Sequence, residues 1–286
     1  IGIPFRNPGH FFRDAVRSVF AQTFDNWELI LVDDGSRDDS VRWAAAIDDP
    51  RVRLVRDGKA LGLVPRLNQI TELSRGKYIA RMDADDMMHP DRLQRQVMFL
   101  EKNPRTDVVD SGAVILDRER KPIGTRGLDS DATPGMLDSM KWGVVLHASV
   151  VARREWYLQH RYDPSFPRAE DRELFVRTLG SSVISHIPEP LYLWFYVGNV
   201  RCREFLLSYK SERRVLLRYG RRLIGWPRTV ALWVRSHMKS AALVVLISMH
   251  RDRVVTRRAY HPINTVLEDD ASKIIARIRD QVVPGW

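Results

Sequence analysis

The chain has 286 residues, of which 44% are hydrophobic and 29% charged. This composition is typical of a folded globular protein and excludes a disordered chain. Its single cysteine, Cys202, excludes an internal disulfide and a cysteine metal cluster, and it favours a reducing cytoplasm. The apolar run that starts at Ile1 predicts a strand and not a signal peptide, and we expect the native chain to start upstream of it.

The formal net charge of +10 comes almost entirely from the last third of the chain. Residues 201–286 contain 18 Lys and Arg against 7 Asp and Glu, whereas residues 1–200 are nearly neutral. Such a change in charge predicts a domain boundary. We therefore expect an N-terminal domain over residues 1–198 and a basic helical extension over residues 199–286.

Short apolar runs alternate with amphipathic stretches over the first hundred residues. We expect strands near residues 1–5, 27–32, 52–55 and 77–82, and helices near residues 11–22, 38–47, 63–74 and 91–103. This alternation predicts a parallel sheet with covering helices. Ligands of such sheets bind beyond the carboxyl ends of the strands.

The pattern is less regular from residue 105 onward. We expect strands near residues 108–116, 144–152, 182–187 and 191–197, and helices near residues 136–142 and 170–179. Residues 125–135 are polar and predict a loop.

Acidic residues follow two of the predicted strands. Asp33 and Asp34 come directly after one strand, and Asp83, Asp85 and Asp86 come after another. Three carboxylates within four residues repel one another unless a cation lies among them, and hard divalent cations prefer oxygen ligands. Taken alone, such a cluster is more often an acidic helix cap. Two clusters at strand ends instead predict one shared binding crevice.

Several separated segments together resemble family 2 glycosyltransferases in order and spacing, over roughly residues 1–197. The matching segments are residues 1–7, 18–24, 28–36, 76–79, 83–86, 90–93, 147–154 and 169–177. The resemblance implies a GT-A fold, an α/β/α sandwich with a mostly parallel central sheet. It also implies a nucleotide-binding half at about 1–104 and an acceptor half at about 105–198.

The resemblance implies transfer of a sugar from a nucleotide-diphosphate sugar, most often a UDP-sugar, to an acceptor hydroxyl with inversion, and Mg²⁺ or Mn²⁺ as cofactor. It points to Asp85 and then Asp86 as metal ligands, and to Asp83 at the ribose or a metal-bound water. A divalent cation stabilises the charge that develops on a departing diphosphate. The expected setting is bacterial envelope or exopolysaccharide synthesis.

The resemblance also assigns donor contacts in the first half of the chain. Asp34 matches the residue that binds the base or ribose, and Pro4 lies where main chain lines the nucleotide pocket. Lys59 and Arg66 are candidates for the diphosphate. The loop departs from the usual pattern there, because Val64 and Pro65 stand where small residues are common.

The acceptor side of the resemblance centres on the predicted helix at residues 170–179. Asp171 matches the base that removes the acceptor proton, and a helix N-terminus favours its ionised form. Glu170 and His147 are expected on the acceptor side. The alternatives are that Glu170 and Asp171 only complement the helix dipole, and that His147 is a buried structural residue.

The basic extension predicts a cationic amphipathic helix near residues 203–222 and an apolar segment near residues 229–250. The longest uncharged run, residues 240–250, is too short to span a bilayer. We expect membrane-surface contact through residues 203–250, with Trp226 and Trp233 at the interface. Packing on the domain or on a second copy is the alternative, and nucleic-acid binding is not expected. A membrane contact would suit a lipid-linked glycan acceptor and a cytoplasmic protein on the inner face of the membrane.

Other functions remain open at this point. A sugar-phosphate nucleotidyltransferase would also use a metal, but it usually has a glycine-rich basic loop after the first strand, which residues 6–9 do not supply. A non-catalytic nucleotide-sugar-binding relative is a further alternative. An EF-hand starting at Asp83 is excluded, because Met88 and Gln94 replace its diagnostic Gly and Glu.

Overall fold

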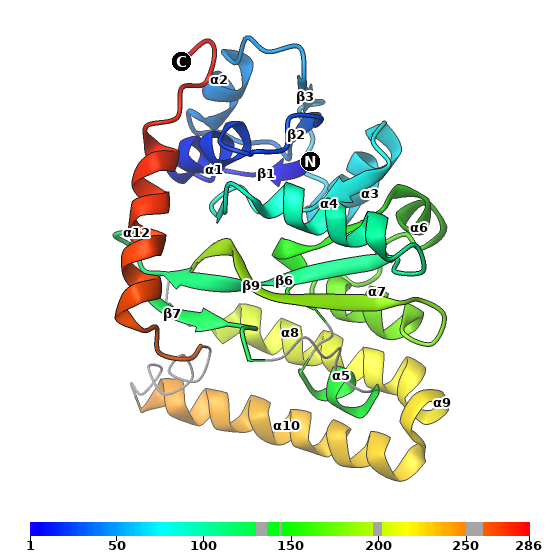
Figure 1. Cartoon of the computed structure of the whole chain (residues 1–286). Coiled ribbons are helices and arrows are strands. Elements are labelled where there is room, and N and C mark those ends of the chain that lie inside the picture. The colour runs from blue at the N-terminus through cyan, green and yellow to red at the C-terminus, as the bar shows by residue number, and fades with distance from the viewer. Residues whose placement is uncertain (130–135, 143–144, 197–201, 250–259) are drawn as a thin grey trace.

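The computed structural model describes residues 1–129, 136–142, 145–196, 202–249 and 260–286 (Figure 1). Most of the loop predicted at 125–135 lies outside these residues, as do the last residue of the predicted strand at 191–197 and the last residue of the predicted apolar segment at 229–250.

The N-terminal part is a three-stranded parallel sheet in the order β1–β2–β3. Its strands are β1 (Gly2–Phe5), β2 (Leu29–Asp33) and β3 (Val52–Arg56), and its helices are α1 (Phe11–Phe20), α2 (Ser40–Ala45) and α3 (Leu63–Leu73). Every residue of β1 and β2 is buried, which explains their continuous apolar runs because both faces of this sheet are covered. The predicted parallel unit is therefore present.

A second sheet runs in the order β4–β8–β6–β9–β5, with β7 paired to β6. Its strands are β4 (Tyr78–Ala80), β5 (Met87–Met88), β6 (Val108–Leu116), β7 (Pro122–Arg126), β8 (Val151–Arg153) and β9 (Ile184–Phe195). β6 and β9 are parallel and the other pairs are antiparallel. A parallel bridge between Gly2 and Arg81 connects the two sheets.

The helices of this part are α4 (Arg92–Lys102), α5 (Met136–Trp142), α6 (Arg154–Gln159) and α7 (Glu170–Thr178). Two predictions were wrong in detail. The strands predicted at 182–187 and 191–197 are one strand, β9. Of the strand predicted at 144–152, residue 144 lies outside the described residues, a 3₁₀ turn occupies His147–Ser149, and the strand, β8, begins only at Val151. The Ser149 hydroxyl donates to the Leu146 carbonyl at 3.0 Å, and such local side-chain bonds compete with strand pairing.

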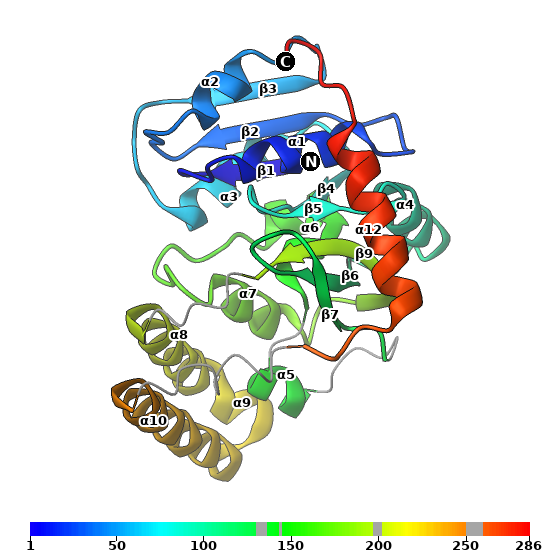
Figure 2. The same ribbon diagram turned by 90° about the vertical axis from the view of Figure 1, so that its left-hand side faces the viewer.

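The C-terminal residues form α8 (Cys202–Val215), a π-helical turn at Leu216–Gly220, α9 (Arg221–Ile224), α10 (Trp226–Ser248) and α12 (Thr265–Arg279). α8 and α10 lie side by side below the second sheet, whereas α12 returns along the molecule to α1 (Figures 1 and 2). The side chain of Trp286 donates to the Trp43 carbonyl at 2.8 Å. The end of the basic extension therefore packs on the N-terminal part. The division near residue 198 stays a prediction.

Candidate active site

Two acidic segments lie at the carboxyl ends of two strands that flank β1. Asp33 ends β2 and Asp34 follows it, while the segment 83–86 follows β4. β1 pairs with β2, and the bridge between Gly2 and Arg81 places the β4 segment on the other side of β1. The two acidic segments therefore lie at one edge of the molecule, on either side of β1.

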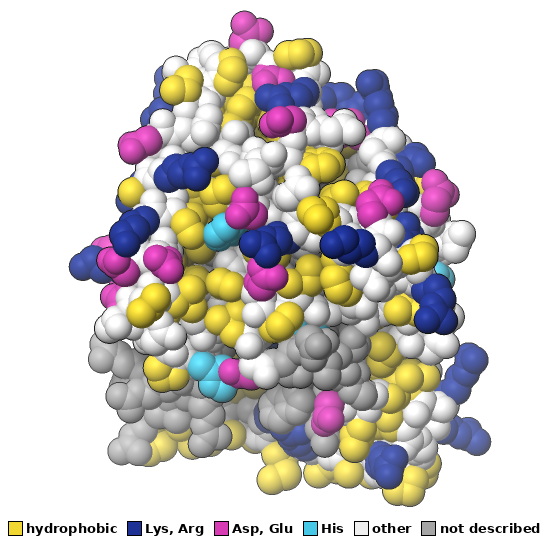
Figure 3. All heavy atoms as spheres, viewed as in Figure 1, with side chains coloured by type: hydrophobic (Ala, Val, Ile, Leu, Met, Phe, Trp, Pro, Cys, Tyr) yellow, Lys and Arg dark blue, Asp and Glu magenta, His cyan; other side chains and the backbone are white. Residues whose placement is uncertain are grey.

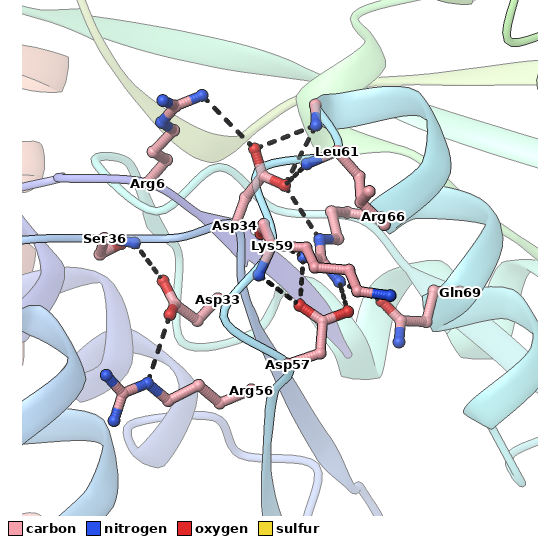
Figure 4. Close-up of polar contacts among 11 residues, drawn as sticks. Arg6, Asp33, Asp34, Ser36, Arg56, Asp57, Lys59, Leu61, Arg66 and Gln69 are labelled. Carbon is pink, nitrogen blue, oxygen red and sulfur yellow. Dashed lines mark hydrogen bonds and ion pairs between the residues drawn. The ribbon is translucent and has the colours of Figure 1, made fainter.

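Asp34 fixes the loop that leads into α3 (Figure 4). Its Oδ1 accepts hydrogen bonds from the main-chain N–H groups of Leu61 at 2.7 Å and Gly62 at 3.1 Å. The same oxygen accepts from Arg66 Nε at 3.0 Å, and Arg6 lies 3.8 Å from Oδ2. Asp34 thus joins the end of β2 to the loop before α3. Its predicted contact with a nucleoside stays a prediction.

Arg66, a predicted diphosphate contact, is bonded to protein groups in this structure, and its contact with a diphosphate stays a prediction. The side chain is fully buried, and all five of its N–H groups have protein acceptors (Figure 4). The acceptors are the carboxylates of Asp34 and Asp57, the Gln69 amide and the Lys59 carbonyl. The hydrogen bond from Arg66 holds the pKa of Asp57 well below its usual range. Arg66 is therefore a structural centre of the loop.

The predicted donor contacts of Lys59 and Pro4 stay predictions. The Lys59 side chain is exposed, whereas its main-chain carbonyl accepts from Arg66. Pro4 is buried in β1 opposite Val32.

The three carboxylates of the second segment have different surroundings. Asp83 forms a two-pronged ion pair with the buried Arg81, with N···O distances of 2.7 and 2.8 Å. Asp86 is buried, and its two oxygens accept hydrogen bonds from the Phe195 N–H at 2.7 Å and the Tyr192 hydroxyl at 2.8 Å. Burial, followed by the charge of Asp85, raises the pKa of Asp86 well above its usual value. Asp86 is thus better placed to anchor the segment to β9 than to bind a metal ion.

Asp85 is the carboxylate whose charge is least compensated by neighbouring groups. Burial and the charge of Asp83 raise its pKa to about 6, and within the described residues its side chain makes no ion pair. Its main-chain carbonyl accepts from Arg120 Nη2 at 2.6 Å. The Arg120 guanidinium lies over the rings of Phe11 and Phe195, at 4.3 and 4.5 Å from their centroids.

The donor set of Asp83 and Asp85 is compatible with a divalent cation. A partly buried carboxylate with a raised pKa gains from a neighbouring cation, and Mg²⁺ is commonly held by one or two carboxylates together with substrate phosphates. Among the described residues, no group of three or more His, Cys, Asp or Glu side chains could hold a metal by itself. A metal here would thus need oxygen ligands from a bound substrate.

The acceptor-side residues gather at the start of α7. Burial and the neighbouring Asp171 raise the pKa of Glu170 to about 7. The Asp171 carboxylate is partly exposed and accepts from the Arg172 N–H at 2.7 Å. His147 Nδ1 lies 4.0 Å from Glu170, and its Nε2 lies 2.7 Å from the Tyr162 hydroxyl. Burial lowers the pKa of His147 well below its usual value, so the imidazole is neutral.

The acidic segment and α7 are connected electrostatically through Arg81. The charges of Arg81 and Asp83 both act on the Glu170 carboxyl, the first lowering and the second raising its pKa. The chain thus brings residues that are about ninety positions apart in sequence into one charged region.

Comparison with known proteins identifies the family. The model of glycosyl transferase family 2 matches residues 1–147, slightly more than half of the chain. EpsE of Bacillus subtilis (strain 168), which is named as a glycosyltransferase, is 35% identical over 254 residues that cover 86% of this chain and 90% of EpsE. The chain belongs to glycosyl transferase family 2.

Solved structures confirm the GT-A expectation for this glycosyltransferase. The crystal structure of S. aureus TarS residues 1–349 in complex with UDP-GlcNAc has a TM-score of 0.65 and 14% identity, over 83% of this chain and 72% of that chain. The mannosyltransferase PcManGT from Pyrobaculum calidifontis, in complex with GDP-Man and Mn²⁺, has a TM-score of 0.56 and 13% identity, over 97% of this chain and 84% of that chain. At such identities the similarity concerns the fold.

Three residues of the candidate site were missed from the sequence. Arg81 pairs with Asp83, Tyr192 donates to Asp86, and Arg120 binds the main chain of Asp85. Arg81 could have been found, because a cation two residues before an acidic cluster is its nearest counter-charge. Tyr192 and Arg120 come from β9 and the turn before β7, and neither position has a local signal that points to residues 85 and 86.

A surface hollow of about 240 Å³ lies elsewhere on this glycosyltransferase. Trp27, Lys77 and Glu101 line it beside Ile1, at the amino end of β1. It is therefore remote from the acidic segments, which follow the carboxyl ends of the strands.

Proposed function

We propose that this glycosyltransferase moves a sugar from a nucleoside diphosphate to an acceptor hydroxyl with inversion at the anomeric carbon. The observation that supports it most is the pair Asp83 and Asp85 at a strand end, one carboxylate held by Arg81 and the other left without an ion pair among the described residues. The N-terminus of α7 supplies a further carboxylate, Asp171, on the acceptor side.

Asp85 is proposed as the direct ligand of Mg²⁺ or Mn²⁺, with Asp83 reaching the ribose or a metal-bound water. When bound, the ion would stabilise the negative charge on the departing nucleoside diphosphate. Asp86, the second predicted ligand, is assigned instead to holding the segment in place, because both of its oxygens already accept hydrogen bonds. The Mn²⁺ complex of PcManGT supports a divalent cation in this fold.

Asp34 and the main chain at Pro4 are proposed to bind the nucleoside, and the exposed Lys59 the diphosphate. The Oδ2 atom of Asp34 makes longer contacts than Oδ1, at 3.1 Å to Gly62 and 3.8 Å to Arg6. It is therefore the oxygen better able to accept a further hydrogen bond from a ribose or base. The UDP-GlcNAc complex of TarS supports a UDP-sugar as donor.

Asp171 is proposed as the base that takes the acceptor proton while the acceptor oxygen attacks the anomeric carbon. It lies in the first turn of α7, at the positive end of the helix dipole. Glu170 and the neutral His147 are proposed to shape the acceptor side. The acceptor is proposed to be a glycan or a lipid-linked glycan in bacterial envelope or exopolysaccharide synthesis, used by a cytoplasmic enzyme on the inner face of the membrane.

The replacement Asp171→Asn tests the base assignment. It removes the proton acceptor but leaves Asp83 and Asp85 unchanged, so we expect transfer to fall by about 10²–10⁴-fold. Mn²⁺-dependent binding of a nucleoside diphosphate, measured by calorimetry, should stay at the wild-type level. Near-normal turnover of the variant would refute Asp171 as the base. Detection of nucleoside diphosphate rather than pyrophosphate as product separates glycosyl transfer from nucleotidyl transfer.

A further inference from the structure

One side of α10 packs on the rest of the protein. Its buried residues are Thr229, Leu232, Ser236 and Leu243, and their spacing of three, four and seven residues places them on one side of the helix. Arg213 of α8 donates to the Ser240 hydroxyl at 2.9 Å, which shows where α8 meets this helix. The opposite side of α10 therefore points away from the protein.

The outward side of α10 is apolar along most of the helix. Trp226 is 57% exposed, Val234 45%, Met238 67% and Val245 54%, and Val230 is exposed between them. Spacings of four and seven residues align these five side chains in one row, which we call the apolar stripe of α10. Figure 3 shows hydrophobic side chains along the lower edge of the molecule, where α10 runs. An ordinary surface helix carries polar residues on its outward side, so the stripe marks an interaction surface.

Cationic side chains border the apolar stripe. Arg228, Arg235 and Lys239 are spaced by seven and four residues, which aligns them between the stripe and the buried side of α10. On the neighbouring α8, Lys210 is exposed, and Arg214 is exposed but donates to the Ser165 carbonyl at 2.7 Å and lies over the Phe166 ring. Residues 203–248 contain ten Lys and Arg against two Glu. The partner of this surface should therefore combine an apolar interior with negative charge at its boundary.

We propose that α10 docks in the plane of an anionic membrane surface. The apolar stripe enters the boundary of the acyl chains, and the bordering cations contact the lipid phosphates. Long Lys and Arg side chains can reach the headgroups while their stems cover apolar surface. This inference sharpens the membrane contact proposed above to one side of one helix. It rests on that surface alone and does not depend on the chemistry of transfer.

The packing of α10 on α8 favours docking over spanning. By length and composition alone, the 23 residues of α10 are sufficient to cross a membrane. α8 runs alongside α10, however (Figure 1). A spanning α10 would draw exposed cations of α8, such as Lys210 and Arg214, into the hydrocarbon, where charged side chains are strongly disfavoured. An in-plane position keeps these cations out of the hydrocarbon.

Vesicle flotation of the full chain tests the proposal. We expect the wild type to float with vesicles of equal parts phosphatidylcholine and phosphatidylglycerol, and to stay at the bottom of the gradient with phosphatidylcholine alone. The double variant Val234→Glu/Met238→Glu should reduce the floating fraction about tenfold, because it places two charges in the stripe. Both side chains are exposed, so the folded state is expected to keep its circular dichroism spectrum and its unfolding midpoint.

Val266→Glu on α12 is the matched control. This valine is 71% exposed but lies outside α10, so the control should float like the wild type. The proposal is overturned if the wild type fails to float, or if the double variant floats as well as the control. It is also overturned if the chain forms a dimer in sedimentation, without binding vesicles, and the double variant abolishes that dimer. In that case the stripe is a contact with a second copy. Because no sugar transfer is measured, a negative result leaves the proposed reaction untouched.

Discussion

At the scale of single residues, Asp85 and Asp86 are neighbours with opposite surroundings. Both oxygens of Asp86 accept hydrogen bonds from β9 residues, namely Phe195 and Tyr192. The carboxylate of Asp85 has no such bond from another described residue, and burial beside Asp83 raises its pKa to about 6. A carboxylate that is costly to ionise in the protein alone is suited to a cation that arrives with substrate. The two side chains should therefore respond differently to truncation.

Replacing each of the two residues by alanine tests this difference. Asp86→Ala leaves the Phe195 N–H and the Tyr192 hydroxyl buried without an acceptor, so we expect it to lower the free energy of unfolding by about 1–3 kcal/mol. Asp85→Ala removes an uncompensated charge and should leave the free energy of unfolding unchanged or slightly raised. It should abolish Mn²⁺-dependent binding of a nucleoside diphosphate. Urea unfolding and calorimetry measure the two effects. Equal loss of stability in both variants would contradict the assignment.

At the scale of elements, one buried arginine holds β2, the loop at residues 57–62 and α3 together. Arg66 lies on α3 and bonds to Asp34 after β2 and to Asp57 in the loop. Its side chain is fully buried, and the bond to Asp34 is shielded from water, whereas Asp57 is partly exposed. The loop that enters α3 therefore has a defined conformation at the edge where the donor is proposed to bind. The same contacts use all five N–H groups of Arg66.

Arg66→Met should destabilise the protein strongly. It leaves the Asp34 and Asp57 carboxylates without their arginine partner. Removing one partner of a buried ion pair costs about 3–5 kcal/mol. Because Asp57 is partly exposed, we expect the lower end of this range. The matched control is Arg56→Met, in which an arginine that is 61% exposed and 3.8 Å from Asp33 is removed. Asp33 is buried, but the Arg56 guanidinium lies largely in solvent and at a long distance from it, so we expect this pair to contribute about 0–1 kcal/mol. Urea unfolding measures the free energy of unfolding of both variants. If Arg66→Met loses no more stability than Arg56→Met, the structural role of Arg66 is refuted.

At the scale of the whole molecule, the C-terminal residues divide between two places. α8, α9 and α10 pack below the second sheet, with Val215, Leu216 and Leu232 in one buried cluster. α12 instead runs along α1 and the second sheet, where Ile275 and Ile278 join Met87 of β5 and Leu193 of β9 in another cluster (Figure 2). The helices of the basic extension therefore do not form a single separate unit. Its last helix belongs to the body of the protein.

Ile278→Ala should show that α12 supports the fold. The side chain is fully buried, and truncation of a buried isoleucine costs about 2–5 kcal/mol. Val266→Ala on the same helix, where the side chain is 71% exposed, should have an effect within about 0.5 kcal/mol. The denaturant midpoint of each variant gives the comparison. If both variants unfold like the wild type, α12 does not contribute to the stability of the N-terminal part.

The sequence by itself was sufficient to predict the parallel unit β1–β2–β3, the helices between its strands and the acidic segments at strand ends. These features depend on local periodicity, since a strand buried on both faces is a continuous apolar run and a covering helix repeats every three or four residues. The spaced motifs were also sufficient to indicate the family, which the comparisons confirm.

Only the tertiary structure decided which charged side chains already have hydrogen-bond or ion-pair partners in the protein. The pairing of β6 with β9, the hydrogen bond from Arg66 to Asp34 and the anchoring of Asp86 by Tyr192 all join positions far apart in the chain. The apolar stripe of α10 was also decided by tertiary structure. Composition shows how apolar a helix is, but it does not show which side of the helix is covered by another helix. Burial and partners depend on three-dimensional packing. Residue type and spacing therefore set the chemistry that was available, and packing selected the side chains free to perform it.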